Sequence, residues 1–425
     1  MSEGATYRSH IAIIGGATAG AEAADRLAAE GALCVVFEQN ERPYGKVEDG
    51  LPAWHEALRQ KEYGIIDSKL TREGVHFVPR TGVGRDVSFD QLLTDWKFDL
   101  VILANGAWRD RPLPVSGADA YINRGLVYQN PFIYWFNHHR EEGYDGPSYQ
   151  VHDGTAVVGG GLASIDVAKV LMLESTCQKL KERGIDQDLF EMEVDGIPST
   201  LEGHGISWDE LGLKGCTLYY RRRIEDMPLA EAPPNAKPEQ LAKIEAVRRR
   251  ILEKAQRKFL FSVDPLWSPV GLLTHGDMLD GLRFARTRIG DDGKAVLVPG
   301  EIQNIEAPMV ISSIGSIPMP IKGLPMDGEL LRLDDVEHGR VTTFENVFGC
   351  GNVVTGKGNL VASRKHSRQV AGFVAEMLGE DSTPRASHES IMEHVKEQQK
   401  AVGYEGGYHD WIGRVSVAAK SACTQ

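Results

Sequence analysis

The chain has 425 residues, of which 42% are hydrophobic and 25% charged, as in a globular protein of roughly two or three domains. Its 47 Lys and Arg against 60 Asp and Glu give a formal net charge of −13, which argues against a general nucleic-acid or anionic-membrane surface. Residues 1–5 lack a signal-peptide core, and no apolar run approaches the roughly 20 residues of a membrane span. A cytoplasmic protein is predicted.

Five cysteines lie far apart and form no Cys-x-x-Cys pair: Cys34, Cys177, Cys216, Cys350 and Cys423. This spacing predicts neither a redox dithiol nor a zinc or iron–sulfur site held by cysteines, so no metal is expected. It fits a reducing compartment.

The first predicted unit has a glycine-rich turn between its first strand and its helix. The unit comprises a strand, a helix and a strand at residues 11–14, 19–29 and 34–37. The turn contains Gly15, Ala17 and Gly20, and backbone amides at such a helix start can face pyrophosphate oxygens. The second strand ends in Glu38, whose carboxylate can accept hydrogen bonds from ribose hydroxyls. The unit predicts a site for FAD or NAD.

A further strand over 100–104 closes this unit, and turn-forming residues over 109–117 predict a domain crossing. A second strand–turn–helix then begins at Thr155 and carries glycines at 159–161 before a helix over about 164–173. The next strand, 216–220, runs into three arginines at 221–223. A guanidinium suits a ribose 2′-phosphate, so this unit predicts NADP. The alternative is that the arginines are a solvated strand end.

Other segments are less specific. A long polar insertion, about 174–215, has no readable fold, and residues 238–259 predict a basic amphipathic helix that is either solvated or a docking surface. Strands are expected at 282–288 and 309–314, and a second crossing at 315–320. Residues 402–411 look too rich in glycine and aromatics for a simple helix. For them a flavin cover, self-association into a homodimer and a surface tail stay open.

Four segments together resemble one family, the adrenodoxin-reductase type of ferredoxin–NADP reductase among the glutathione-reductase-like two-dinucleotide flavoproteins. More loosely they resemble the small subunit of glutamate synthase. The segments are 42–55, the aromatic run 131–137, the second glycine turn with 220–228, and 347–352 with Gly356 and Gly358. The likeness covers nearly the whole chain.

The resemblance implies an α/β fold with two Rossmann-like dinucleotide-binding domains. A discontinuous FAD domain would comprise 1–115 and 320–425, and an NADP domain, 116–319, would be inserted between them. Hydride would pass from NADPH to FAD, and electrons would leave singly to an iron–sulfur protein such as ferredoxin. Basic residues over 248–258, or Arg364, Lys365 and Arg368, are expected to dock an acidic partner.

The matching positions also imply site residues. Polar groups that orient the cofactors and handle protons would be His55, Asp166 and an acidic residue after the arginines, Glu225 or Glu231. Beyond the first turn and Glu38, the implied cofactor contacts are Gly45, Lys46, Val47, Gly159, Gly161, Leu162, Ala163, Arg221, Arg222, Gly351, Asn352, Gly358, Asn359 and Leu360.

The chain also departs from the family. Ala17 replaces the second glycine of the first turn, Leu162 replaces an Asn, and Asn352 stands where relatives have Trp or Asp. Lys46 and Glu48 replace Leu and Arg, and Glu48 facing the flavin would lower its potential by charge repulsion. These departures predict weaker FAD binding and an altered nicotinamide pocket.

Two alternatives to a free ferredoxin reductase remain. One is an NADPH-oxidising electron-input subunit of a glutamate-synthase-like complex, although its usual cysteine-rich N-terminal extension is missing. The other is a non-catalytic sensor that binds NADP(H) or FAD. A disulfide reductase is disfavoured because it needs a cysteine pair beside the flavin.

Overall fold

The computed structural model describes residues 7–233, 235–356, 358–379 and 383–420. The chain divides into two compact units. Unit 1 comprises residues 1–109, 137–145 and 316–425, and unit 2 comprises 110–136 and 146–315. The expected crossings lay at 115/116 and 319/320. The membership of residues 137–145 in unit 1 was not predicted.

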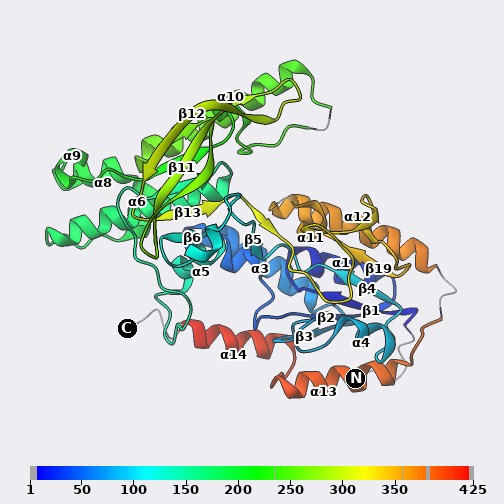
Figure 1. The fold of residues 1–425 in the computed structure, drawn as a ribbon. Helices are drawn as coiled ribbons and strands as arrows, with labels where there is room; N and C mark the ends of the chain where they lie inside the picture. The colour runs from blue at the N-terminus through cyan, green and yellow to red at the C-terminus, as the bar shows by residue number, and fades with distance from the viewer. Residues whose placement is uncertain (1–6, 234, 357, 380–382, 421–425) are drawn as a thin grey trace. The chain divides into compact units, whose positions relative to one another are not determined.

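Unit 1 is built on a seven-stranded sheet in the order β17-β18-β19-β4-β1-β2-β3 (Figure 1). Strands β19, β4, β1, β2 and β3 are parallel, and β17 and β18 extend the sheet antiparallel. The strand bounds are β1 Ser9–Ile14, β2 Ala32–Phe37, β3 Val75–Val78, β4 Leu100–Leu103, β17 Leu333–Asp335, β18 Arg340–Val341 and β19 Val347–Gly349. Short pairs are β5 Arg109–Asp110 with β14 Ser316–Ile317, and β15 Met326–Asp327 with β16 Leu330–Leu331.

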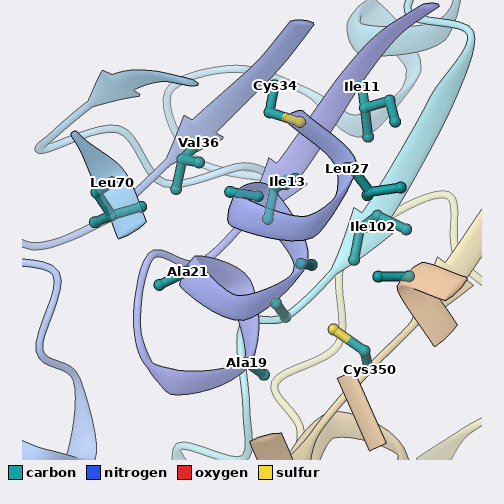
Figure 2. Packing of buried hydrophobic residues seen from close by; sticks show 14 of the residues in the cluster. Ile11, Ile13, Ala19, Ala21, Leu27, Cys34, Val36, Leu70, Ile102 and Cys350 are labelled. Carbon is teal, nitrogen blue, oxygen red and sulfur yellow. The ribbon is translucent and has the colours of Figure 1, made fainter. Parts of the chain in front are cut away.

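Helices cover both faces of this sheet, because side chains alternate along each buried strand. Ile11 and Ile13 share one core with α1 and α12, and Ala12 and Ile14 share another with α4 and α13. Figure 2 shows the first core, where α1 residues pack on Ile13 and Val36. The helices of unit 1 are α1 Thr18–Ala29, α2 Lys46–Asp49, α3 Glu56–Leu70, α4 Phe89–Thr94, α11 Asn352–Thr355, α12 Leu360–Leu378, α13 His388–Ala401 and α14 Tyr408–Lys420.

The segment 402–411 is not one simple helix, as its glycines indicate, because residues 402–407 are irregular and a helix begins only at Tyr408. Residues from Tyr408 onward form the regular helix α14, and the glycines that weaken the helical pattern lie before its start. Tyr408 and Trp411 are 8% and 4% exposed and belong to the unit 1 core. These two aromatic side chains therefore belong to the packed core of unit 1, and self-association of the segment stays untested.

Unit 2 contains a five-stranded parallel sheet in the order β6-β13-β7-β8-β9. These strands are β6 Leu126–Tyr128, β7 Ala156–Gly159, β8 Thr217–Tyr220, β9 Ser262–Pro265 and β13 Val310–Ser313. A separate antiparallel sheet holds β10 Trp267–His275, β11 Met278–Ile289 and β12 Ala295–Glu306. Its helices are α6 Leu162–Glu182, α7 Leu189–Asp195, α8 Ile197–Gly203, α9 Trp208–Leu211 and α10 Pro238–Phe259, and α5 Gln129–His138 crosses the unit boundary.

Two further observations concern the described residues as a whole. None of their helices combines the length and the apolar character that crossing a membrane requires. Cys34, Cys216 and Cys350 are free thiols, and Cys423 lies outside the described residues.

Candidate dinucleotide-binding sites

The first glycine turn is shaped by close backbone approach. Gly15 has φ +99°, and a Cβ there would lie 2.7 Å from the carbonyl oxygen of Ala104. A Cβ at Gly20 would lie 1.8 Å from the carbonyl oxygen of Gly15, so only glycine lets α1 start this close to β1. The amides of the first turn of α1 are thus presented at the carboxyl end of the sheet.

Ala17 faces a second turn of the same unit. A Cβ at Gly45 would stand 3.0 Å from the Ala17 methyl carbon, and Gly45 has φ +52°. The extra methyl group at position 17 therefore packs toward the segment that carries Gly45.

Glu38, directly after β2, is hydrogen-bonded to this turn, and its predicted contact with a ribose stays a prediction. One carboxylate oxygen accepts from the backbone N–H of Gly16 at 2.8 Å, and the other from that of Asn40 at 3.0 Å. The side chain is buried, and burial raises the pKa of Glu38 to about 7 although these hydrogen bonds lower it.

Three buried side-chain oxygens at this edge have no hydrogen-bond partner among the residues that the structure describes. They belong to Thr18 after β1, Asn105 after β4 and Asn352 after β19. These strands are neighbours in the order β19-β4-β1. Buried polar atoms normally have partners, and open α/β sheets bind ligands at the carboxyl ends of their strands. The donor and acceptor set at this edge therefore fits a polar cofactor such as FAD.

The segment after Gly45 begins with α2. Lys46 donates to the Ser316 hydroxyl at 3.0 Å and lies 5.8 Å from the Trp108 ring centre, and Val47 is buried. Glu48 is buried beside Arg42, with 2.8 Å between their charged groups. Burial raises the pKa of Glu48 to about 7, and the Arg42 charge opposes that rise. Glu48 is thus paired with a cation, and charge repulsion between Glu48 and a flavin stays a prediction.

Asn137 and His138 form hydrogen bonds with residues in and next to α2, and these contacts were not predicted from the sequence. The Asn137 amide donates to the carbonyl oxygens of Glu48 and Leu51, both at 2.9 Å. His138 contacts Asp49 at 3.1 Å and Glu141 at 2.9 Å. The aromatic run was noticed, but its distance in sequence from residues 46–51 hid this role.

The remaining implied unit 1 residues lie on two elements. His55 ends the short 3₁₀ turn Ala53–His55 and is half-buried. Gly351 has φ +71°, and a Cβ there would lie 2.6 Å from that of Ala19, which brings the turn after β19 against α1. Gly358, Asn359 and Leu360 form the start of α12, where the Asn359 side chain caps the amides of Val361 and Ala362.

The second glycine turn differs in what each glycine faces. Cβ atoms at Gly159 and Gly160 would lie 2.3 Å from Ser313 and 2.2 Å from the Tyr220 ring, so packing requires both glycines. At Gly161 a Cβ would meet no described atom within 4 Å. Leu162 follows with 54% exposure, and Ala163 is half-buried. The start of α6 is thus open to a ligand, as a phosphate site requires.

The three arginines after β8 differ in their hydrogen-bond partners. Arg222 donates to the Gly293 carbonyl at 2.7 Å, and Arg223 makes two hydrogen bonds to Asp226, at 3.0 and 3.1 Å. The Arg221 guanidinium is exposed and forms no hydrogen bond or ion pair within the described part of the chain. Arg221 therefore has the freest guanidinium for a ligand phosphate.

Asp166 and Glu225 are linked to residues at different positions along α10. Asp166 lies 3.9 Å from Lys169, which pairs with Glu193 at 2.8 Å, and burial raises the pKa of Asp166 to about 6. Lys169 also lies over the ring of Phe259, the last residue of α10. Glu225 instead pairs with Arg249, ten residues earlier on α10, or about 15 Å along the axis. Glu231, the other acidic candidate, lies in the exposed loop before α10.

Comparisons with known proteins agree with this architecture. Residues 9–182 match the family described as pyridine nucleotide-disulphide oxidoreductase. The NADPH:adrenodoxin oxidoreductase of Arabidopsis thaliana is 22% identical over 93% of this chain and 88% of its own length. Cindoxin reductase of Citrobacter braakii is 32% identical, but over only 46% of this chain and 41% of its own length. Mycobacterium tuberculosis FprA, solved with NADPH, has a TM-score of 0.65 at 18% identity, over 97% of this chain and 90% of its own.

The two parallel strand–helix units with their glycine turns are those of a protein with two dinucleotide-binding domains, and the chain is similar to flavoprotein reductases built in this way. Within that class, the resemblance to the adrenodoxin-reductase type of ferredoxin–NADP reductase is confirmed. The looser resemblance to glutamate synthase is also found, since the Bacillus subtilis small chain is 36% identical over 29% of this chain and 24% of its own length.

Proposed function

We propose that this protein is an FAD-dependent oxidoreductase that takes hydride from NADPH and passes electrons singly to an iron–sulfur protein such as ferredoxin. The observation that carries the proposal is the pairing of two glycine turns with opposite charges at the following strand ends. Glu38 serves the first turn and Arg221 the second. The names of the relatives, NADPH:adrenodoxin oxidoreductase and FprA in complex with NADPH, support it.

Unit 1 would hold FAD. The α1 amides would face the pyrophosphate, and the oxygens of Thr18, Asn105 and Asn352 would find partners on the cofactor. Gly45, Lys46 and Val47 would line the flavin side, on an α2 that Asn137 fixes. Bound flavin links a two-electron hydride donor to a one-electron acceptor. His55 would orient the reactants there and handle a proton.

Unit 2 would hold NADPH. The open start of α6, at Gly161 and Leu162, would receive its pyrophosphate. Arg221 would bind the 2′-phosphate, because a free guanidinium makes strong charge-assisted hydrogen bonds to phosphate. Asp166, with its raised pKa, would remain partly protonated near neutral pH.

An acidic iron–sulfur partner would dock on α10. Lys243, Arg250, Lys254 and Arg257 are exposed, and their spacing of seven, four and three residues places them on one helix face. None of the four pairs with another described acidic side chain. The α12 patch expected from sequence is less suitable, because Arg364 and Arg368 pair with Glu62 and Glu22. The free thiols of Cys34, Cys216 and Cys350 fit work in a reducing compartment such as the cytoplasm.

The test is reduction of an acidic ferredoxin by NADPH with a charge-reversed α10. We expect the double variant Arg250→Glu/Lys254→Glu to raise the Michaelis constant for ferredoxin about ten-fold and flatten its salt dependence. Reduction of a small uncharged acceptor should not change. Lys365→Glu, an equally exposed cation on α12, is the control. Equal Michaelis constants for the double variant and the control would contradict docking on α10.

The second candidate is the electron-input subunit of a glutamate-synthase-like complex, favoured by the 36% identity to that small chain. A holoprotein that reduces artificial acceptors but no ferredoxin, and that copurifies with a large partner, would support this candidate instead.

A further inference from the structure

Residues 38–45, here called the β2 loop, connect the two parts of the proposed FAD site. The loop begins at Glu38, which holds the amide of Gly16, and ends at Gly45, which faces Ala17. Between them Pro43 comes so close to the glycine turn that a Cβ at Gly16 would lie 2.9 Å from its side chain. The β2 loop therefore packs directly against the first glycine turn, and its position affects the space around that turn.

Trp411 of helix α14 is hydrogen-bonded to the middle of the β2 loop. Its indole N–H donates to the carbonyl oxygen of Glu41 at 2.7 Å. Arg80 pairs with the Glu41 carboxylate and lies 5.2 Å from the Trp411 ring centre. Trp411 is 4% exposed, so water does not compete for its indole hydrogen bond.

A second link joins α14 to the far end of the loop through Asp67 of α3. The hydroxyl of Tyr408, on α14, donates to the Asp67 carboxylate at 2.7 Å. The hydroxyl of Tyr44, in the loop, donates to the same carboxylate at 3.1 Å. Burial raises the pKa of both phenols, so both remain donors at neutral pH. One carboxylate thus fixes a loop residue and a residue of α14 together.

We propose that α14 is a positioning element for FAD. It holds the β2 loop in the cofactor-binding conformation through Trp411 and through Tyr408 and Asp67. This inference rests on the proposed FAD site in unit 1. No step of the chemistry uses these side chains, and none of them is placed in contact with the cofactor. A loop ordered in advance binds more tightly, because less ordering remains to be done on binding.

The experiment measures FAD affinity of the flavin-free full-length protein by calorimetric titration. Trp411→Phe removes the indole hydrogen bond and keeps a ring, and Tyr408→Phe removes the hydroxyl alone. Tyr404→Phe is the matched control, since its ring packs on Trp411 but its hydroxyl bonds to no described residue. Hydrogen exchange over residues 38–45 is followed in parallel, because a merely structural role would not concentrate the change in this loop.

We expect each α14 variant to raise the FAD dissociation constant about three- to ten-fold, as loss of one buried hydrogen bond implies. Exchange over the β2 loop should quicken in the flavin-free variants and return to normal with saturating FAD. Dissociation constants within two-fold of the unmodified protein for both variants would overturn the proposal alone. An unmodified protein that binds no FAD would overturn the proposed function, and this inference with it.

Discussion

Arg221 is the residue that we expect to distinguish NADPH from NADH. Since Arg222 and Arg223 are engaged with Gly293 and Asp226, Arg221 is the arginine best able to bind a 2′-phosphate. We expect Arg221→Ala to raise the Michaelis constant for NADPH about 10- to 100-fold, since a hydrogen bond to a charged group contributes about 1.5–3 kcal/mol. The constant for NADH should hardly change. Arg223→Ala is the control, and an equal loss with both nucleotides would contradict the assignment.

The pairing of His138 with Asp49 of α2 should stabilise the folded protein in a pH-dependent way. Burial lowers the pKa of His138, but the hydrogen bonds to Asp49 and Glu141 raise it to about 9. A pKa above the ordinary value means that the charged form stabilises the folded state below about pH 6.5 and that this contribution is lost as pH rises through about 9. We expect His138→Gln to lower the melting temperature most at pH 6, and by a vanishing amount at pH 10. A difference that grows with pH would contradict this sign.

Some candidate site residues could be placed from the sequence, and the contacts of others could not. Glu38 lies where the strand–turn–helix pattern placed it, because spacing within one βαβ unit is local. The neutralising Arg42 beside Glu48 and the Asn137 bonds to α2 depend on side-chain direction and on contacts between distant segments. Neither is encoded in spacing along the chain.

Short turns shape the proposed FAD site. Gly45 has φ +52° and faces the Ala17 methyl, so Gly45→Ala introduces both strain and a close contact. We expect it to lower the free energy of unfolding of the flavin-free protein by about 1–3 kcal/mol in urea denaturation. Gly64→Ala, inside α3 where a Cβ meets nothing within 4 Å, should raise it by about 0.5–1 kcal/mol. Equal effects of the two substitutions would contradict the role of Gly45.

Elements with a strong pattern were the best predicted. The amphipathic stretch 238–259 is α10 over the same residues, and the two glycine-turn strands and helices lie where expected. Helix α6 runs nine residues beyond its expected end at 173, because the polar residues after Leu173 continue the helix without a breaker. Strands β10 and β12 were missed, since their many exposed positions break the alternation on which a strand prediction relies.

At the scale of the whole molecule, the repetition of two glycine turns was the strongest sequence signal. It correctly indicated two sheets that each contain a parallel strand–helix–strand unit, because each turn requires a unit of its own. The return of residues 137–145 to unit 1 could not be foreseen, since it depends on contacts with α2 that are formed only in the folded chain.

The central claim, FAD in one unit and NADPH reducing it from the other, is tested most directly by the visible absorption spectrum of the purified protein under anaerobic conditions. We expect flavin bands that bleach on addition of NADPH, and more slowly with NADH. A colourless protein that gains no flavin on incubation with FAD, or a bound flavin that neither nucleotide bleaches, would contradict it.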